Sequence, residues 1–150
     1  PATVAGTLFI VEDKWDRHGP WRFLVDTGST ITLVSPEFAN RYGNTRNAPG
    51  RPPARVYSAT GESVLLASVR IDQIRLGDAR FSDVPAVVRS LDDVSTHVGF
   101  KIDGVLGYPL FRDVLLTLDY PRRRLFILPA GEPPVLKGDT LSTDATRRVP

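Results

Sequence analysis

One carboxylate at the end of an apolar stretch is the clearest candidate for chemistry in this chain. Residues 23–25 are apolar and predict a strand that delivers Asp26 to its end. Thr27, Gly28 and Ser29 follow as a small, tight turn, in which a glycine permits close backbone approach. The same residues also fit an Asx turn, in which Asp26 merely accepts backbone N–H groups. The motif by itself leaves a catalytic acid and a plain turn residue both open.

Other catalytic and metal-binding patterns are missing from the sequence. It has no cysteine, which excludes disulfides, thiolate chemistry and Cys-ligated zinc. It also has no phosphate-binding glycine-rich loop, no His-Glu-x-x-His and no Gly-x-Ser-x-Gly, so we expect no cofactor and no metal. The two histidines, His18 and His97, lie far apart in the sequence. We expect both to be surface residues rather than metal ligands or members of a triad.

Composition and charge narrow the class of partner. Of the 150 residues, 41% are hydrophobic and 24% are charged, which is typical of one globular domain. The formal net charge of +2 is too small to indicate a nucleic acid or an acidic membrane as partner. Because the sequence has no run of about 18 apolar residues, we expect no membrane contact from this segment.

Short β-branched and aromatic runs separated by Gly, Pro, Asp and Asn predict an all-β fold, a small barrel or sandwich. The domain is expected over residues 1–129, followed by a polar C-terminal tail at 130–150. Nine strands are expected, at 5–12, 21–26, 31–34, 55–58, 63–74, 80–84, 86–88, 114–119 and 124–128.

One or two short helices are expected among these strands. Ser35 and the proline after it predict a helix start, and Gly43 predicts its end. Residues 109–112 predict a single helical turn, whereas residues 91–101 are expected to be irregular.

Taken in order along the chain, these pieces resemble the retroviral-type aspartic proteases, and especially their bacterial, retropepsin-like relatives. The resemblance covers about residues 5–128. It comprises the strand and turn at Asp26, a short helix, a hairpin with Thr60 and Gly61 at its tip, and the apolar segment Val105–Gly107. Each piece is common by itself, whereas their order is specific. The resemblance implies a closed, homodimeric β-barrel in which Val105–Gly107 packs against the turn at Asp26.

The resemblance also implies aspartic endopeptidase chemistry at Asp26, with Thr27 and Gly28 in the catalytic loop. Hydrolysis by this route uses two carboxylates that share one proton and hold a water between them. The chain has a single Asp-Thr-Gly loop, because Asp103 is not followed by Thr or Ser and the Asp-Thr pair at 139–140 has no glycine after it. We therefore expect a second copy to supply the second carboxylate, in a C2 homodimer that acts on a polypeptide.

A hairpin is expected to serve as the flap that covers the substrate. Family flaps carry glycine at the tip, which lets them open and close. Here Ala59, Thr60 and Gly61 form the tip, with one glycine. Tyr57 lies near the place where pepsin-like flaps carry a tyrosine, but it is one residue further from Thr-Gly. Substrate contact and plain strand packing are both open for Tyr57, whereas Thr60 and Gly61 are expected to bond the substrate backbone.

Ser29 is expected to support the pair of carboxylates. Its hydroxyl can donate a hydrogen bond to the ionised Asp26, and stabilisation of the charged form lowers the pKa of the pair. This interaction predicts an acidic optimum for cleavage. Alternatively, Ser29 bonds the backbone of its own turn and leaves the titration unchanged.

Two other functions fit the same fold. A dimer that kept the fold but lost catalysis would bind extended peptides by strand addition, and a purely structural dimerisation domain would bind none. The intact motif at Asp26 argues against both, because a carboxylate at a crowded two-fold axis is costly. By the same resemblance, terminal strands at 1–12 and 124–128 are expected to hold the dimer.

The sequence does not reveal the compartment. The chain begins at Pro1 instead of a methionine and contains no methionine at all, which favours a trimmed or processed domain. A periplasmic or membrane-tethered soluble domain is the resulting expectation, although the absence of cysteine fits cytoplasm and periplasm equally.

Overall fold

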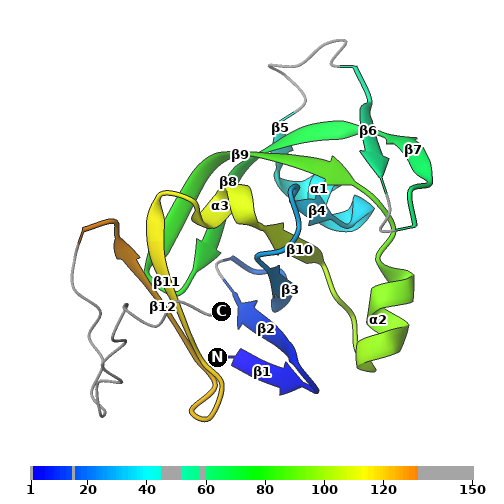
Figure 1. The fold of residues 1–150 in the computed structure, drawn as a ribbon. Coiled ribbons are helices and arrows are strands. Elements are labelled where there is room, and N and C mark those ends of the chain that lie inside the picture. Colours follow the sequence, from blue (N-terminus) through cyan, green and yellow to red (C-terminus); the bar gives the residue numbers. More distant parts are fainter. Residues whose placement is uncertain (1, 15, 45–51, 58–59, 132–150) are drawn as a thin grey trace, which may run out of the picture.

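The computed structural model describes residues 2–14, 16–44, 52–57 and 60–131, which form a mostly β fold, as predicted (Figure 1). The expected tail lies outside these residues from position 132 onward. The helices are α1 (Pro36–Tyr42), α2 (Asp92–Val98) and α3 (Tyr108–Phe111). The strands are β1 (Ala2–Ala5), β2 (Leu8–Asp13), β3 (Trp21–Asp26), β4 (Leu33–Val34), β5 (Gly43–Asn44), β6 (Ala54–Tyr57), β7 (Ser63–Leu66), β8 (Ser68–Leu76), β9 (Ala79–Val88), β10 (Gly104–Gly107), β11 (Val114–Asp119) and β12 (Arg124–Pro129).

Eight strands form one open sheet in the order β1-β2-β3-β10-β4-β9-β8-β5. Its outer strands, β1 and β5, do not pair with each other within the described residues, so the predicted closed barrel is wrong. Closure requires the first and last strands to share a hydrogen-bonded register. β5 offers only Gly43 and Asn44, and both pair with β8. The remaining described strands form two separate two-stranded sheets, β6–β7 and β11–β12.

Several strand boundaries also differ from those predicted. The strand expected at 5–12 is a hairpin of β1 and β2, and the strand expected at 63–74 divides into β7 and β8. The two strands expected on either side of Pro85 are one continuous strand, β9. This strand tolerates the proline because β4 pairs only with Val87 and Val88, which leaves one edge of β9 open near Pro85.

The strand that leads to Asp26 is buried on both faces. In β3, Trp21, Phe23 and Val25 belong to the larger hydrophobic core, whereas Leu24 belongs to a second, smaller one. β2 and β10, the neighbours of β3 in the sheet, divide their side chains between the same two cores. Because both faces are covered, these strands read as continuous apolar runs in the sequence, and β3 gives Asp26 a rigid base.

β10 lies between β3 and β4 and brings a distant segment beside Asp26 (Figure 1). It runs parallel to β3, with Gly107 opposite Asp26, and antiparallel to β4. A Cβ at Gly104 would lie 2.7 Å from the ring of Phe23 and 3.0 Å from the Leu33 carbonyl oxygen. Glycine is therefore needed at this position for the three strands to approach so closely.

The segment expected to be irregular contains α2, so the described residues hold three helices rather than one or two. Leu91, Val94 and Val98 follow helical spacing and pack into the smaller core. Gly99 ends the helix with a φ of 84°. The helices α1 and α3 lie where the sequence predicted them. None of the described helices is long and apolar enough to cross a membrane.

Candidate active site

The Asp26 loop, defined as residues 26–32, begins where β3 ends and carries an exposed carboxylate. Asp26 Oδ1 accepts a hydrogen bond from the backbone N–H of Gly28 at 3.0 Å. The backbone N–H of Ser29 donates to the Asp26 carbonyl oxygen at 3.1 Å. The Asx turn considered from the sequence is therefore present. It orients the carboxylate while leaving it accessible to solvent, so the turn and a chemical role are compatible.

Ser29 does not make the contact that the sequence predicted. Its hydroxyl donates to the Ile31 carbonyl oxygen at 2.8 Å and accepts from the Ile31 backbone N–H at 3.4 Å. These contacts replace the expected hydrogen bond to the Asp26 carboxylate. A serine side chain reaches backbone groups two residues away within one turn, so the alternative interpretation, a serine that bonds its own turn, is the one observed.

Backbone contacts from two distant segments hold the Asp26 loop in place. The N–H of Tyr108, at the start of α3, donates to the Ser29 carbonyl oxygen at 2.8 Å. The N–H of Val87, in β9, donates to the Thr32 carbonyl oxygen at 2.9 Å. These donors belong to regular elements of the fold. The position of the loop is therefore set by β9 and α3 as well as by hydrogen bonds within the loop itself.

Gly107 and Thr32 form a tight contact beneath the loop. The N–H of Gly107 donates to the Thr32 hydroxyl at 3.3 Å, and Thr32 is only 3% exposed. A Cβ at Gly107 would lie 2.2 Å from the Ile31 carbonyl oxygen, a distance that no side chain can accommodate. The predicted packing of Val105–Gly107 against the turn is confirmed. The sequence analysis missed Thr32, although a hydroxyl residue within an apolar strand directly after the motif was a usable signal.

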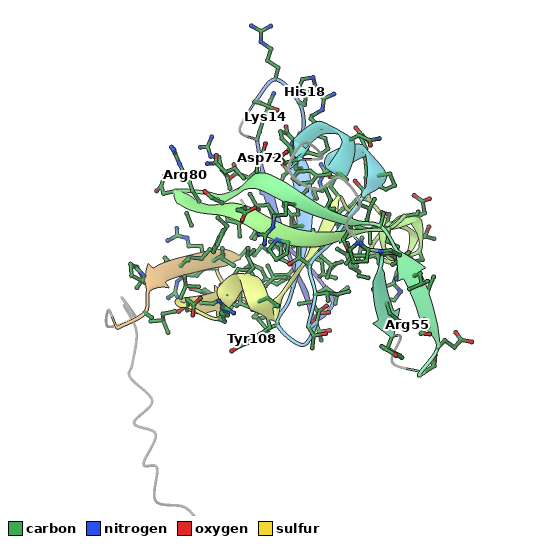
Figure 2. The ribbon with its side chains drawn as sticks, turned by 90° about the horizontal axis from the view of Figure 1, so that it is seen from above. Lys14, His18, Arg55, Asp72, Arg80 and Tyr108 are labelled. Atoms are coloured by element: carbon green, nitrogen blue, oxygen red, sulfur yellow. The ribbon has the colours of Figure 1, made fainter. Side chains whose placement is uncertain are left out.

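A cleft of about 1110 Å³ opens beside Asp26, between the Asp26 loop and the β6–β7 hairpin. Figure 2 shows this hairpin, with Arg55, projecting from one end of the molecule. Arg89, which directly follows β9, also lines the cleft. The apolar part of the lining consists of Ile31, Leu33, Val56, Tyr57, Val64 and Leu66. A cleft of this volume, with a partly apolar lining and an exposed carboxylate, suits an extended chain as ligand.

The structure places the predicted flap residues on or next to the β6–β7 hairpin. Tyr57 lines the cleft and its side chain is 68% exposed, so it contributes little packing within the described chain. Thr60 and Gly61 are exposed between the two strands, and Gly61 has a φ of 86°, which glycine adopts without strain. Ala59 lies outside the described residues.

The two histidines lie away from the cleft. Arg41 Nη1 donates a hydrogen bond to His18 Nε2 at 2.9 Å, and His18 Nδ1 lies 3.6 Å from Asp16 Oδ2. Figure 2 shows His18 and Arg55 on opposite sides of the molecule. His97 is exposed on α2. Within the described part of the chain, no group of three His, Asp or Glu side chains is arranged to hold a metal ion.

Comparison with known proteins agrees with this geometry. The family model of the aspartyl proteases matches residues 10–110. A crystal structure of a retropepsin-like aspartic protease from Rickettsia conorii is similar to this one, with a TM-score of 0.53 and 19% sequence identity, covering 85% of this chain and 86% of that chain. No curated protein sequence matches the chain. Because the family model spans more than half of its length, this chain belongs to the aspartyl protease family, and its fold is that of the retropepsin-like members.

Proposed function

We propose that this protein is an aspartic endopeptidase that works as a C2 homodimer, with Asp26 of each copy at the two-fold axis. One observation carries the proposal: an exposed carboxylate, held by a backbone-anchored loop, lines a cleft of about 1110 Å³. Membership of the aspartyl protease family supports peptide hydrolysis as the class of reaction. The proposal adds to this reaction class a homodimeric assembly and a role for each residue of the site.

The proposed chemistry rests on two carboxylates that share one proton. At a separation of about 3 Å, two carboxylates cannot both be ionised, so one is protonated when the other is charged. The ionised group takes a proton from a water held between them, and this water attacks the peptide carbonyl carbon. The protonated group donates its proton toward the carbonyl oxygen.

The second carboxylate has to come from a second copy of the chain. Asp103 is the other aspartate near the active-site strands, but it is only 1% exposed and its Oδ2 accepts from the Arg22 backbone N–H at 3.0 Å. It therefore has a structural role. Thr27 is exposed beside Asp26, and we assign its hydroxyl the role of bracing the loop of the second copy. Gly28 leaves room for that approach.

The β6–β7 hairpin is the proposed flap. It forms a two-stranded sheet of its own, so it can move relative to the large sheet without breaking other strand pairs. Tyr57 would then close over the substrate side chains, and the tip at Thr60 and Gly61, with Ala59 beside them in the sequence, would bond the substrate backbone. The apolar lining of the cleft supports cleavage between hydrophobic residues.

Hydrolysis of denatured casein from pH 3 to pH 8, with and without a statine inhibitor, tests this function. We expect inhibitor-sensitive cleavage by the wild-type protein. Asp26→Asn should reduce cleavage to below a few per cent, because an amide cannot act as a base, while the circular dichroism spectrum and the dimer remain. Cleavage that persists in this variant would contradict the assignment.

The same experiment separates the alternative functions. Casein peptides that bind without being cleaved would support a catalytically inactive peptide-binding module. Absence of both binding and cleavage would support a structural dimerisation domain. Sedimentation of the protein as a monomer, at concentrations at which it cleaves casein, would contradict the homodimer.

A further inference from the structure

The cleft beside Asp26 carries arginines on both of its walls, which an apolar peptide would not need. Arg89 stands at the end of β9, next to the sheet, and Arg55 stands on β6 in the hairpin. Among the described residues that line the cleft, Glu62 and Asp26 are the other charged ones. In a dimer whose two aspartates share one proton, Arg55 and Arg89 of both copies contribute four positive charges, against three ionised carboxylates among Asp26 and Glu62. Apart from the catalytic pair, the charged residues that line the cleft therefore carry a net positive charge.

A backbone hydrogen bond holds Arg89 in place, and its guanidinium has more N–H donors than its one described partner uses. Its backbone N–H donates to the Val34 carbonyl oxygen at 3.0 Å, which ties it to the strand that follows the Asp26 loop. One guanidinium nitrogen pairs with Asp93 of α2. The Arg89 side chain is 44% exposed. Because a guanidinium has five N–H donors in a rigid fork, one partner does not saturate it.

The pair with Asp93 does not cancel the charge that a ligand in the cleft meets. Asp93 is 59% exposed and lies outside the set of described residues that line the cleft. Ion pairs that are exposed to this degree are weak, so a competing carboxylate can share the guanidinium. The pair with Asp93 instead holds the Arg89 side chain in one orientation, which lowers the entropy lost when a ligand binds.

Arg55 is held in a similar way on the opposite wall. Its Nη1 donates to the Ser63 hydroxyl at 3.2 Å, across the hairpin from β6 to β7. Ser63 also lines the cleft. Figure 2 shows Arg55 on the hairpin, far from Arg80, which lies at the other end of the β8–β9 ribbon. An extended peptide between the walls would pass between the two guanidinium groups.

We propose that this cleft selects polypeptides with an acidic side chain near the scissile bond, which Arg89 binds and Arg55 assists. The inference rests on the proposed function and deepens it. Because the two copies are related by a two-fold axis through the aspartates, each side of the scissile bond would meet one Arg89. Acidic residues are then favoured at equivalent distances before and after the cleaved bond.

Paired peptides test this selection. Each pair has the same hydrophobic scissile residues and differs only in Glu or Gln at one flanking position, moved outward stepwise on both sides. We expect wild-type kcat/KM to favour Glu over Gln by about fivefold to tenfold at one position on each side, since hydrogen bonds to charged groups are among the stronger ones. Arg89→Gln should remove the preference, and Arg89→Glu should reverse it, so that Gln is favoured over Glu at the same position.

Arg80→Gln is the matched control. Arg80 lies near the start of β9, and Arg89 directly follows the end of that strand, about 30 Å away at the ordinary rise of a strand; Arg80 is exposed. This variant should keep the full Glu preference. Equal cleavage of the Glu and Gln peptides by the wild-type protein would overturn the inference. So would a Glu preference that survives in Arg89→Gln.

A binding measurement keeps the inference separate from catalysis. Fluorescently labelled Glu and Gln peptides are titrated with the Asp26→Asn protein, with and without Arg89→Gln. Tighter binding of the Glu peptide through Arg89, together with no cleavage by the wild-type protein, would support the inference while the proposed function fails. Cleavage with no preference would overturn the inference alone. Absence of any peptide binding would overturn both.

Discussion

The two walls of the cleft are built in opposite ways. The Asp26 loop receives hydrogen bonds from β9, β10 and α3, through Val87, Gly107 and Tyr108. The β6–β7 hairpin pairs with no other strand of the described chain, and its Tyr57, Val64 and Leu65 are more than half exposed. One wall is fixed by the core of the protein, whereas the other depends mainly on its own two strands.

This difference matches the roles that we propose for the two walls. In the proposed dimer, a carboxylate that must meet its counterpart at a defined distance needs a position set before substrate binds. A cover for an extended chain has to open, admit the ligand and close, so it needs few contacts that would be lost on opening. The sequence encodes the two requirements separately, as buried glycines and a buried threonine around the loop and as exposed apolar residues on the hairpin.

Two glycines, one in each region, should respond to alanine very differently. In Gly107→Ala the new Cβ would lie 2.2 Å from the Ile31 carbonyl oxygen, so we expect the free energy of unfolding to fall by about 3 kcal/mol and the activity to be lost. In Gly61→Ala the Cβ meets nothing within 4 Å, and only the positive φ costs free energy, about 1 kcal/mol. Urea unfolding of both variants measures the difference. Equal losses of stability would contradict the contrast between the walls.

Tyr57→Ala should change catalysis and leave stability alone. Tyr57 is 68% exposed and lines the cleft, so we expect the free energy of unfolding to stay within about 0.5 kcal/mol. Contact of the ring with substrate predicts a decrease in kcat/KM of about tenfold, equivalent to about 1.4 kcal/mol. Leu65→Ala is the matched control, since Leu65 is 55% exposed on the same hairpin but lies outside the described lining of the cleft. If the two variants lose the same activity, Tyr57 has no specific contact with substrate.

Ser29→Ala should have the smallest effect on catalysis. The hydroxyl is bonded to Ile31, so its removal should lower the free energy of unfolding by about 1 kcal/mol. The acidic limb of the kcat/KM profile should move by less than about 0.2 pH unit, or about 0.3 kcal/mol. Profiles of both proteins on one peptide provide the measurement. A rise of the acidic limb by half a pH unit or more would show that Ser29 stabilises the ionised aspartate after all.

Local signals in the sequence were sufficient for the elements that carry the site. The apolar residues of β3, the turn after Asp26 and the Ser35 cap of α1 are each encoded by adjacent residues. The Ser35 hydroxyl indeed accepts the Phe38 N–H at 3.2 Å. The family resemblance placed the apolar segment Val105–Gly107 against the turn, although the sequence did not predict it as a strand, which β10 is.

Features that depend on contacts between distant residues could not be predicted from adjacent residues in the sequence. Whether a sheet closes is decided by the pairing of its outer strands, and nothing in β1 or β5 alone specifies it. α2 lacks a side-chain N-cap bond and is held by packing of Val94 and Val98 on the smaller core. The helix is short, so its apolar residues do not repeat often enough to reveal a helical period in the sequence. Ser29 had two acceptors within reach, and the choice between them follows from the backbone of the folded turn.

We propose that one active site needs Asp26 from two copies of the chain, and a subunit-mixing experiment tests this requirement. Wild-type protein and the Asp26→Asn variant are combined in equal amounts, allowed to exchange subunits, and assayed at constant total concentration. Random pairing leaves about one quarter of the dimers with two aspartates, so we expect about one quarter of the wild-type activity. Activity of about one half, proportional to the wild-type fraction, would mean that each chain works alone and would rule out a shared active site.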